Sequence, residues 1–103
     1  MINRPTKDQI QPTGDMILVE TLEVKNETLG GVLLPVNHSD PEEYGLIVAV
    51  GPGYYQNGVL VKPRVTPGDI VMLRAGRGLP VRVGHDHLRF MNERDFLAVI
   101  GKM

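Results

Sequence analysis

Histidines are the side chains in this sequence most suited to binding a metal. His85 and His87 are two residues apart, so on a strand both imidazoles would face the same side, and His38 could be a third ligand. Three imidazoles suit zinc or nickel. However, the polar sequence Gly84-His-Asp-His87 is typical of an exposed turn, and no carboxylates accompany it at ligand spacing. We therefore predict a turn at this point and no metal site.

A glycine-containing motif offers the other route to chemistry. Gly51-Pro-Gly53 resembles the start of a dinucleotide-binding fingerprint, but the final glycine is missing and the residues that follow are typical of a hairpin. No helix N-terminus would then be available to hold a phosphate. The spacing of the polar residues yields neither a Ser/His/Asp arrangement nor a pair of carboxylates at a cleft. We predict that the chain is not an enzyme and that it binds no cofactor itself.

Charge and composition argue against nucleic acid and membranes as partners. Tyr54 and Tyr55 could stack on nucleobases, but only Lys62, Arg64 and a few scattered arginines accompany them. The net charge of the 103 residues is −1 and the pI is about 6.3, so no strong positive field surrounds the protein. Apolar runs such as 46–50 are far too short to span a bilayer.

The first nine residues and the absence of cysteine bear on the compartment. Residues 1–9 (MINRPTKDQ) lack the apolar core of a secretory signal and the arginine-rich pattern of a transit peptide. Without Cys there is no disulfide framework and no thiolate zinc site. We predict a cytoplasmic protein in which residues 1–9 form a flexible N-terminal arm.

The elements that would position these residues are short strands. The chain has 13 Val and 6 Ile, which suit strands, against only 3 Ala, and it has 12 Gly and 8 Pro for turns. Asn57-Gly58 predicts a type I′ hairpin, and Thr66-Pro-Gly-Asp69 suits a type II turn. No window predicts an amphipathic helix, so the fold class is all-β. Strands recur about every 8 to 12 residues, as in a sandwich or barrel; we expect them at 15–22, 44–50, 54–56, 59–61, 70–73, 79–83, 88–91 and 96–100, with a turn at 75–78.

The segment 25–40 does not fit this pattern simply. It contains several aliphatic residues, yet Gly30-Gly31 and Pro35 interrupt it. One interpretation is a third strand of the core. The other is a loop that presents an aliphatic patch to a partner, since Gly-Gly weakens a strand and long loops in small domains are usually functional or disordered. The residues alone leave both interpretations open.

Several motifs occur in an order that is similar to a known family. They are Gln11-Pro-Thr-Gly-Asp-Met-Ile-Leu-Val19, Gly30-Gly-Val-Leu-Leu34, Gly45-Leu-Ile-Val-Ala-Val-Gly-Pro-Gly53, the Asn-Gly hairpin, Val65-Thr-Pro-Gly-Asp-Ile-Val71, Gly76-Arg-Gly78 and Glu93-Arg-Asp-Phe-Leu-Ala-Val-Ile100. Together they resemble the chaperonin 10 family, the GroES-type co-chaperonins, from about Ile10 to Lys102. The order and spacing of the motifs carry the resemblance, because no single motif is decisive.

The resemblance implies both a fold and a function. The implied fold is a small, partly open β-barrel over residues 10–103, with a mobile loop at about 21–35 and a roof hairpin at about 53–62. Seven copies would form a ring that caps a 60-kDa-type chaperonin and encloses unfolded client proteins. The chaperonin, not this chain, would bind and hydrolyse ATP with Mg.

Site residues follow from the same resemblance. The loop would dock on the chaperonin through Gly30, Gly31, Val32, Leu33 and Leu34. The roof would be formed by Tyr54, Tyr55, Gln56, Asn57 and Gly58. The first and last strands would pair between neighbouring subunits through Met16, Ile17, Leu18, Leu97, Val99 and Ile100. The chamber wall would carry Arg77.

The sequence departs from the family pattern, which keeps an alternative open. Thr13 and Met16 stand where the family usually has Leu and Arg, the hairpin tip lacks acidic residues, and Arg77 stands where an aromatic residue is common. The alternative is a monomeric or dimeric β-barrel module that binds nucleic acid or another protein. Alcohol dehydrogenases that contain a GroES-like barrel need zinc ligands and a nucleotide-binding domain, and this chain has neither.

Overall fold

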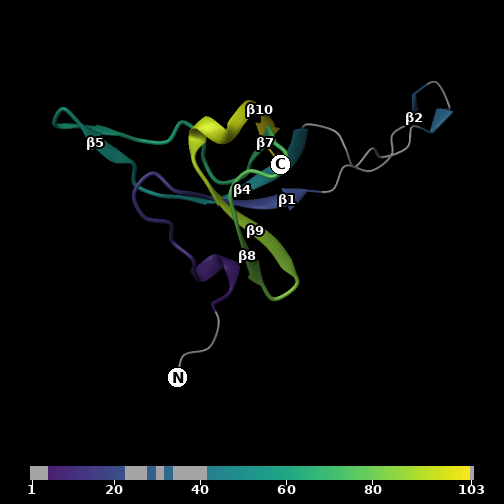
Figure 1. Cartoon of the computed structure of the whole chain (residues 1–103), viewed down its shortest axis with the longest axis horizontal. Helices are drawn as coiled ribbons and strands as arrows, with labels where there is room; N and C mark the ends of the chain where they lie inside the picture. The colour runs from purple at the N-terminus through teal and green to yellow at the C-terminus, as the bar shows by residue number, and fades with distance from the viewer. Residues whose placement is uncertain (1–4, 23–27, 30–31, 34–41, 103) are drawn as a thin grey trace.

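Strands make up nearly all of the regular structure, as Figure 1 shows. The computed structural model describes residues 5–22, 28–29, 32–33 and 42–102. Within these residues the only helical elements are two short 3-10 turns, so the predicted all-β class is confirmed. The elements are η1 (Lys7–Gln9), β1 (Ile17–Leu22), β2 (Thr28–Leu29), β3 (Val32–Leu33), β4 (Glu42–Val50), β5 (Tyr54–Gln56), β6 (Val59–Val61), β7 (Asp69–Arg74), β8 (Leu79–Val83), β9 (Asp86–Met91), η2 (Glu93–Asp95) and β10 (Phe96–Lys102).

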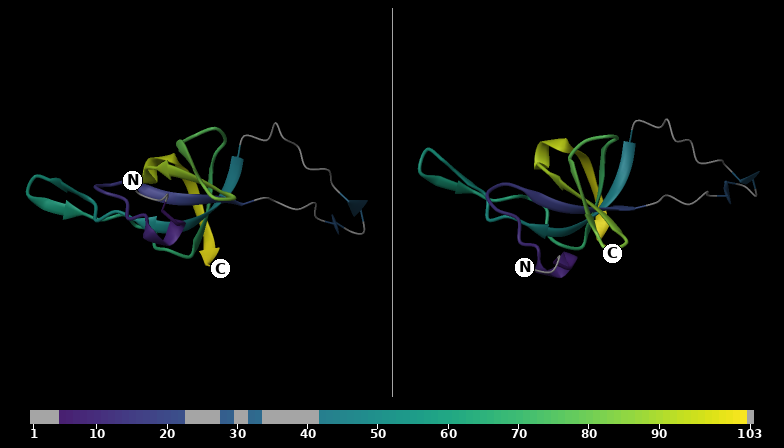
Figure 2. Two further views of the ribbon diagram at one scale, coloured as in Figure 1. Left: turned by 90° about the horizontal axis from the view of Figure 1, so that it is seen from below. Right: turned by 60° about the horizontal axis from the view of Figure 1, so that its bottom comes forward.

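Six of the strands form one antiparallel sheet in the order β10-β7-β4-β1-β9-β8. The strands β7 and β8 are joined only by the turn 75–78, although three strands separate them in the sheet order. In a flat sheet they would lie about 19 Å apart, at about 4.8 Å per strand. The turn is tighter than that, because the Arg77 amide donates to the Arg74 carbonyl at 3.4 Å. The sheet therefore curls into a partly open barrel whose free edges are β8 and β10 (Figure 2).

The core consists of two apolar clusters on the two faces of β1. Successive side chains of a strand alternate between faces, so Ile17 and Val19 join one cluster and Leu18 joins the other. The first cluster also contains Ile47, Val65, Val71, Leu73 and Met91, and the second contains Val83 and Leu88. Full burial of each such side chain is worth about 1.5–3 kcal/mol. The strand β1 is therefore the central element of the fold.

The two turns predicted from sequence are confirmed. Asn57 has φ 52° and Gly58 has φ 81°, as a type I′ turn requires, and they join β5 to β6. Gly68 has φ 95°, and the Asp69 amide donates to the Thr66 carbonyl at 3.1 Å, as in a type II turn. The local sequence therefore determines both turns.

The structure adds detail near the N-terminus and at the predicted histidine turn. The residues Lys7–Gln9 form η1, and the Lys7 ammonium lies 2.9 Å from the Glu20 carboxylate on β1.

The predicted histidine turn is shorter than expected, because β9 begins at Asp86 and only Gly84 and His85 form the turn. None of the helical segments in the described residues is long and apolar enough to cross a membrane.

Candidate functional site

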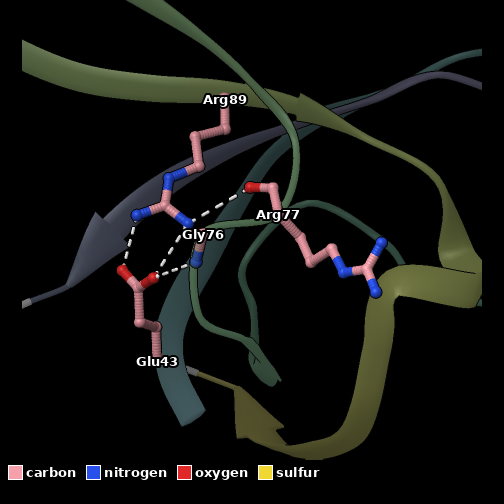
Figure 3. Close-up of polar contacts among 4 residues, drawn as sticks. All are labelled: Glu43, Gly76, Arg77 and Arg89. Atoms are coloured by element: carbon pink, nitrogen blue, oxygen red, sulfur yellow. Dashed lines mark hydrogen bonds and ion pairs between the residues drawn. The ribbon is translucent and has the colours of Figure 1, made fainter. Parts of the chain in front are cut away.

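One end of the barrel is organised by a polar cluster drawn from three segments (Figure 3). Glu43 lies at the start of β4, Arg89 lies on β9, and Gly76 lies in the turn between β7 and β8. The Arg89 guanidinium donates to both carboxylate oxygens of Glu43, with Nη1 at 3.2 Å from Oε1. The Gly76 amide donates to the same Oε1 at 2.9 Å. Arg89 Nη1 also lies 3.3 Å from the Arg77 carbonyl oxygen. We call these four residues the seam cluster.

The seam cluster is partly shielded from water, which strengthens the attraction between the Arg89 and Glu43 charges. The side chains of Arg89 and Glu43 are 19% and 27% exposed. A guanidinium that donates to both oxygens of a carboxylate is among the stronger ion-pair geometries. The Arg89 hydrogen bonds lower the pKa of the Glu43 carboxyl; its partial burial opposes this and the Gly76 hydrogen bond adds to it. Glu43 therefore remains ionised at neutral pH and holds the turn to the sheet.

The turn 75–78 packs directly on β9. Gly78 has φ 91°, and a Cβ at that position would lie 2.8 Å from Met91 Cγ and 3.1 Å from the Phe90 carbonyl oxygen. Only glycine allows this approach. The Arg77 side chain is exposed and points away from Glu43 and Arg89, so only its backbone joins the cluster (Figure 3). The predicted turn is confirmed, while a role for Arg77 in a chamber wall stays a prediction.

The predicted docking segment leaves and re-enters the sheet at this same end. The strand β1 runs through Leu22 and β4 resumes at Glu42, so Thr21 and Leu22 of the expected loop belong to the sheet, paired with Gly45 and Tyr44. Gly30, Gly31 and Leu34 lie outside the described residues.

Val32 and Leu33 form β3, which pairs with β2 as a separate two-stranded ribbon. Neither β2 nor β3 joins the six-stranded sheet, so the interpretation of a third core strand is wrong for the residues described. The alternative, a loop that presents aliphatic residues, stays a prediction.

The hairpin β5–β6 lies at the other end of β4. It projects beyond the sheet (Figure 1), and its tip residues Gln56, Asn57 and Gly58 are exposed. Tyr54 and Tyr55 are 47% and 75% exposed. The predicted hairpin is confirmed, and its role as a roof stays a prediction.

The residues predicted for subunit contacts divide into two groups. On β10, which has only one neighbour in the sheet, Leu97, Val99 and Ile100 are 49%, 55% and 53% exposed. On β1, by contrast, Ile17 and Leu18 are fully buried.

The expectation that the first strand is a free edge is wrong, because β4 and β9 occupy the two sides of β1. Met16, which precedes β1, is half-buried, and its carbonyl accepts a hydrogen bond from Gly51 at 2.9 Å. Of the two groups, only β10 presents apolar side chains at a sheet edge.

The histidines do not assemble a site in the described part of the chain. His85 and His87 are exposed, and His38 lies outside the described residues. No group of three His, Asp or Glu side chains in those residues is placed to hold a metal ion. Glu43 and Arg89 are not among the site residues predicted from the sequence. No local pattern marks them, since residues 43, 76 and 89 meet only after the sheet has curled.

The lowered pKa of Glu43 predicts a defined pH dependence of stability. The stabilisation that ionised Glu43 contributes to the folded protein is complete above its ordinary pKa of 4.5. It is lost as pH falls through the lower pKa of the folded state. At pH 7, Glu43→Gln should therefore lower the free energy of unfolding by roughly 1 kcal/mol. The difference in free energy of unfolding between the two proteins should become smaller in denaturant titrations below about pH 4.5. Asp8→Asn, on the exposed turn η1, is the matched loss of charge and should change stability by less than about 0.5 kcal/mol. An equal difference in free energy of unfolding at pH 3 and pH 7 would contradict the lowered pKa of Glu43.

Comparisons with known proteins agree with this architecture. A family model described as Chaperonin 10 Kd subunit matches residues 9–100. The Co-chaperonin GroES of Leptothrix cholodnii is 35% identical over 95 residues, which are 91% of this chain and 99% of that protein. The Co-chaperonin GroES of Streptomyces albus G is 30% identical over 102 residues, or 99% of this chain and all of that protein. That of Coprothermobacter proteolyticus is 34% identical over 94 residues, which cover 90% and 96% of the two chains. The chain therefore belongs to the chaperonin 10 family, as the order of its motifs predicts.

Proposed function

We propose that this protein is a co-chaperonin, a ring of seven copies that caps a 60-kDa-type chaperonin and encloses client proteins. The observation that carries the proposal is the family match over residues 9–100, together with relatives named Co-chaperonin GroES. In this proposal the chain has no catalytic role, and the chaperonin binds and hydrolyses the ATP. The alternative, a monomeric or dimeric binding module, lacks a supporting observation of its own.

Assembly in this proposal uses the exposed edge of β10. The sheet has two edge strands, β10 and β8. Along β8, Pro80 cannot donate a backbone hydrogen bond and Arg82 adds an exposed charge, features that protect an edge from strand addition. Along β10, Leu97, Val99 and Ile100 are half exposed and apolar. These differences support β10 as the edge that a neighbouring copy covers.

A charge placed on β10 should break the ring. Val99→Asp would leave an unpaired carboxylate in the covered interface, which is costly, so the variant should sediment as monomers or small oligomers. Leu79→Asp is the control, because Leu79 is 65% exposed on the other edge strand; it should keep a mass near seven times 11.4 kDa. The assignment of β10 fails if Val99→Asp retains the full ring while remaining folded by circular dichroism.

Docking in this proposal uses the three aliphatic residues 32–34. Their burial in an apolar groove would contribute about 5–9 kcal/mol. Ordering even five backbone residues would cost about 5–10 kcal/mol. A single segment would then bind weakly, whereas several copies linked in a ring can gain a factor of about 10²–10⁴ by avidity. Weak individual contacts also let the cap dissociate when the chaperonin changes state.

The docking residues are tested by one substitution. Leu33→Asp would bury a charge without a partner in the groove. The variant ring should stay assembled but should lose binding to the chaperonin in the presence of nucleotide, measured by co-sedimentation, and should no longer support refolding. Asn26→Asp adds the same charge at a polar residue of the segment and should bind normally. Normal capping by Leu33→Asp would show that the binding residues lie elsewhere.

We further propose that Arg77 faces the chamber. The support is its exposed guanidinium, which makes no ion pair with the residues described, on a turn held only through the backbone. A charged wall offers clients less apolar surface than an aromatic one and should release them more readily.

Arg77→Tyr tests this role of the side chain. Only the carbonyl of Arg77 contributes to the seam cluster, so ring mass and capping should be unchanged in the variant. The yield or rate of refolding of enclosed clients should shift, because a tyrosine offers them more apolar surface. Identical refolding of several clients by the two proteins would remove the chamber-wall role.

A further inference from the structure

The seam cluster lies at the point where the docking segment joins the barrel. Glu42 and Glu43 are the first residues of β4, and they pair with Arg74 and Leu73 on β7. Beyond Leu22, β1 no longer accompanies β4, because its last pair is Leu22 with Tyr44. Among the residues that the structure describes, the backbone at Glu43 therefore has a strand neighbour on one side only. On its other side, the described contacts of Glu43 are the side-chain bonds to Arg89 and Gly76.

Arg89 joins two strands that do not pair with each other. It lies on β9, beside β8, whereas Glu43 lies on β4, beside β7. The ion pair therefore connects the two strands that flank β1, at the end of the barrel where the turn 75–78 joins β7 to β8. The remaining bonds, from Gly76 to Glu43 and from Arg89 to the Arg77 carbonyl, attach the connecting turn from both sides (Figure 3).

We propose that Glu43 and Arg89 are positioning residues for chaperonin binding: they hold the exit of the docking segment and the Arg77 turn in one fixed arrangement at the end of the barrel. This inference rests on the proposed function. The docking segment re-enters the sheet at Glu42, so a fixed position for the start of β4 would let a ring present all of its docking segments in register. Loss of preorganisation weakens binding even where no contact residue is changed.

The test is the affinity of each intact ring for a 60-kDa-type chaperonin with ATP present, alongside the thermal stability of the ring. Glu43→Gln and Arg89→Met should each keep the ring mass and weaken binding by about fivefold or more, because linked contacts compound a loss of register. The double variant should bind no more weakly than either single variant, since both remove one connection. The amide of Gly76 should also exchange faster with solvent in Glu43→Gln.

Three controls separate positioning from a general loss of stability. Val83→Ala removes part of a side chain that is only 8% exposed in the second core cluster; it should lower stability as much or more and leave affinity unchanged. Glu20→Gln breaks the Lys7 ion pair elsewhere on the sheet and should leave affinity unchanged. The exchange of Glu43→Arg with Arg89→Glu restores opposite charges but offers no acceptor to Gly76 and no donor to the Arg77 carbonyl, so it should not restore affinity.

Each outcome decides the proposal. If Glu43→Gln and Arg89→Met bind like the parent ring while Leu33→Asp does not bind, the positioning role is wrong and the proposed function stands. If Val83→Ala weakens binding as much as Arg89→Met, the effect is one of stability and the positioning role is also wrong. If Leu33→Asp binds normally, the proposed docking mode fails and the positioning role fails with it. Should Arg89→Met not fold, Arg89→Lys replaces it, because a lysine keeps the charge but cannot bind Glu43 with two parallel bonds.

Discussion

The turn between β7 and β8 imposes the constraint on which the rest of the barrel depends. It must connect two strands that β4, β1 and β9 separate in the sheet, and four residues can do so only if the sheet curls. Curling encloses one face of β1, which carries the larger of the two clusters of buried residues. It also leaves a gap between the two edge strands, because β8 pairs only with β9 and β10 pairs only with β7. Glycine at 78 makes the approach of the turn to β9 possible.

An ion pair can connect strands that do not pair with each other. The strand β1 separates β4 from β9, and β7 cannot pair with β8 because β4 and β10 occupy both of its sides, yet two long side chains can still join β4 to β9. Arg89 reaches Glu43 from β9 and still has a donor for the Arg77 carbonyl. Because water is only partly excluded, the pair contributes modestly to stability. Its larger effect is geometric, since it determines where the turn and the start of β4 lie.

Local sequence signals predicted most of the fold and little of its polar cluster. Asn57-Gly58 and Pro67-Gly68 determine their turns through φ angles alone, so both were predictable. The apolar runs at 17–19 and 96–100 look alike in sequence, yet the first is fully buried and the second half exposed. An uninterrupted apolar run indicates that both faces of a strand are covered, but it does not say whether the cover comes from the same chain. The order of strands in the sheet decides that, and it depends on contacts between distant residues.

The two edges of the sheet are unequal, which bears on the kind of assembly that this chain can form. Pro80 disfavours the addition of a neighbouring strand at β8, whereas no proline lies on β10. If β10 paired with the β10 of a second copy, a two-fold axis would complete the contact and growth would stop at a dimer. A ring instead requires β10 to meet a different part of its neighbour, so that every copy both offers and receives one contact. Because Pro80 and Arg82 disfavour strand addition at β8, an edge contact between β10 and the β8 of a neighbour is disfavoured. The receiving surface in the proposed ring therefore lies on neither edge strand of the six-stranded sheet.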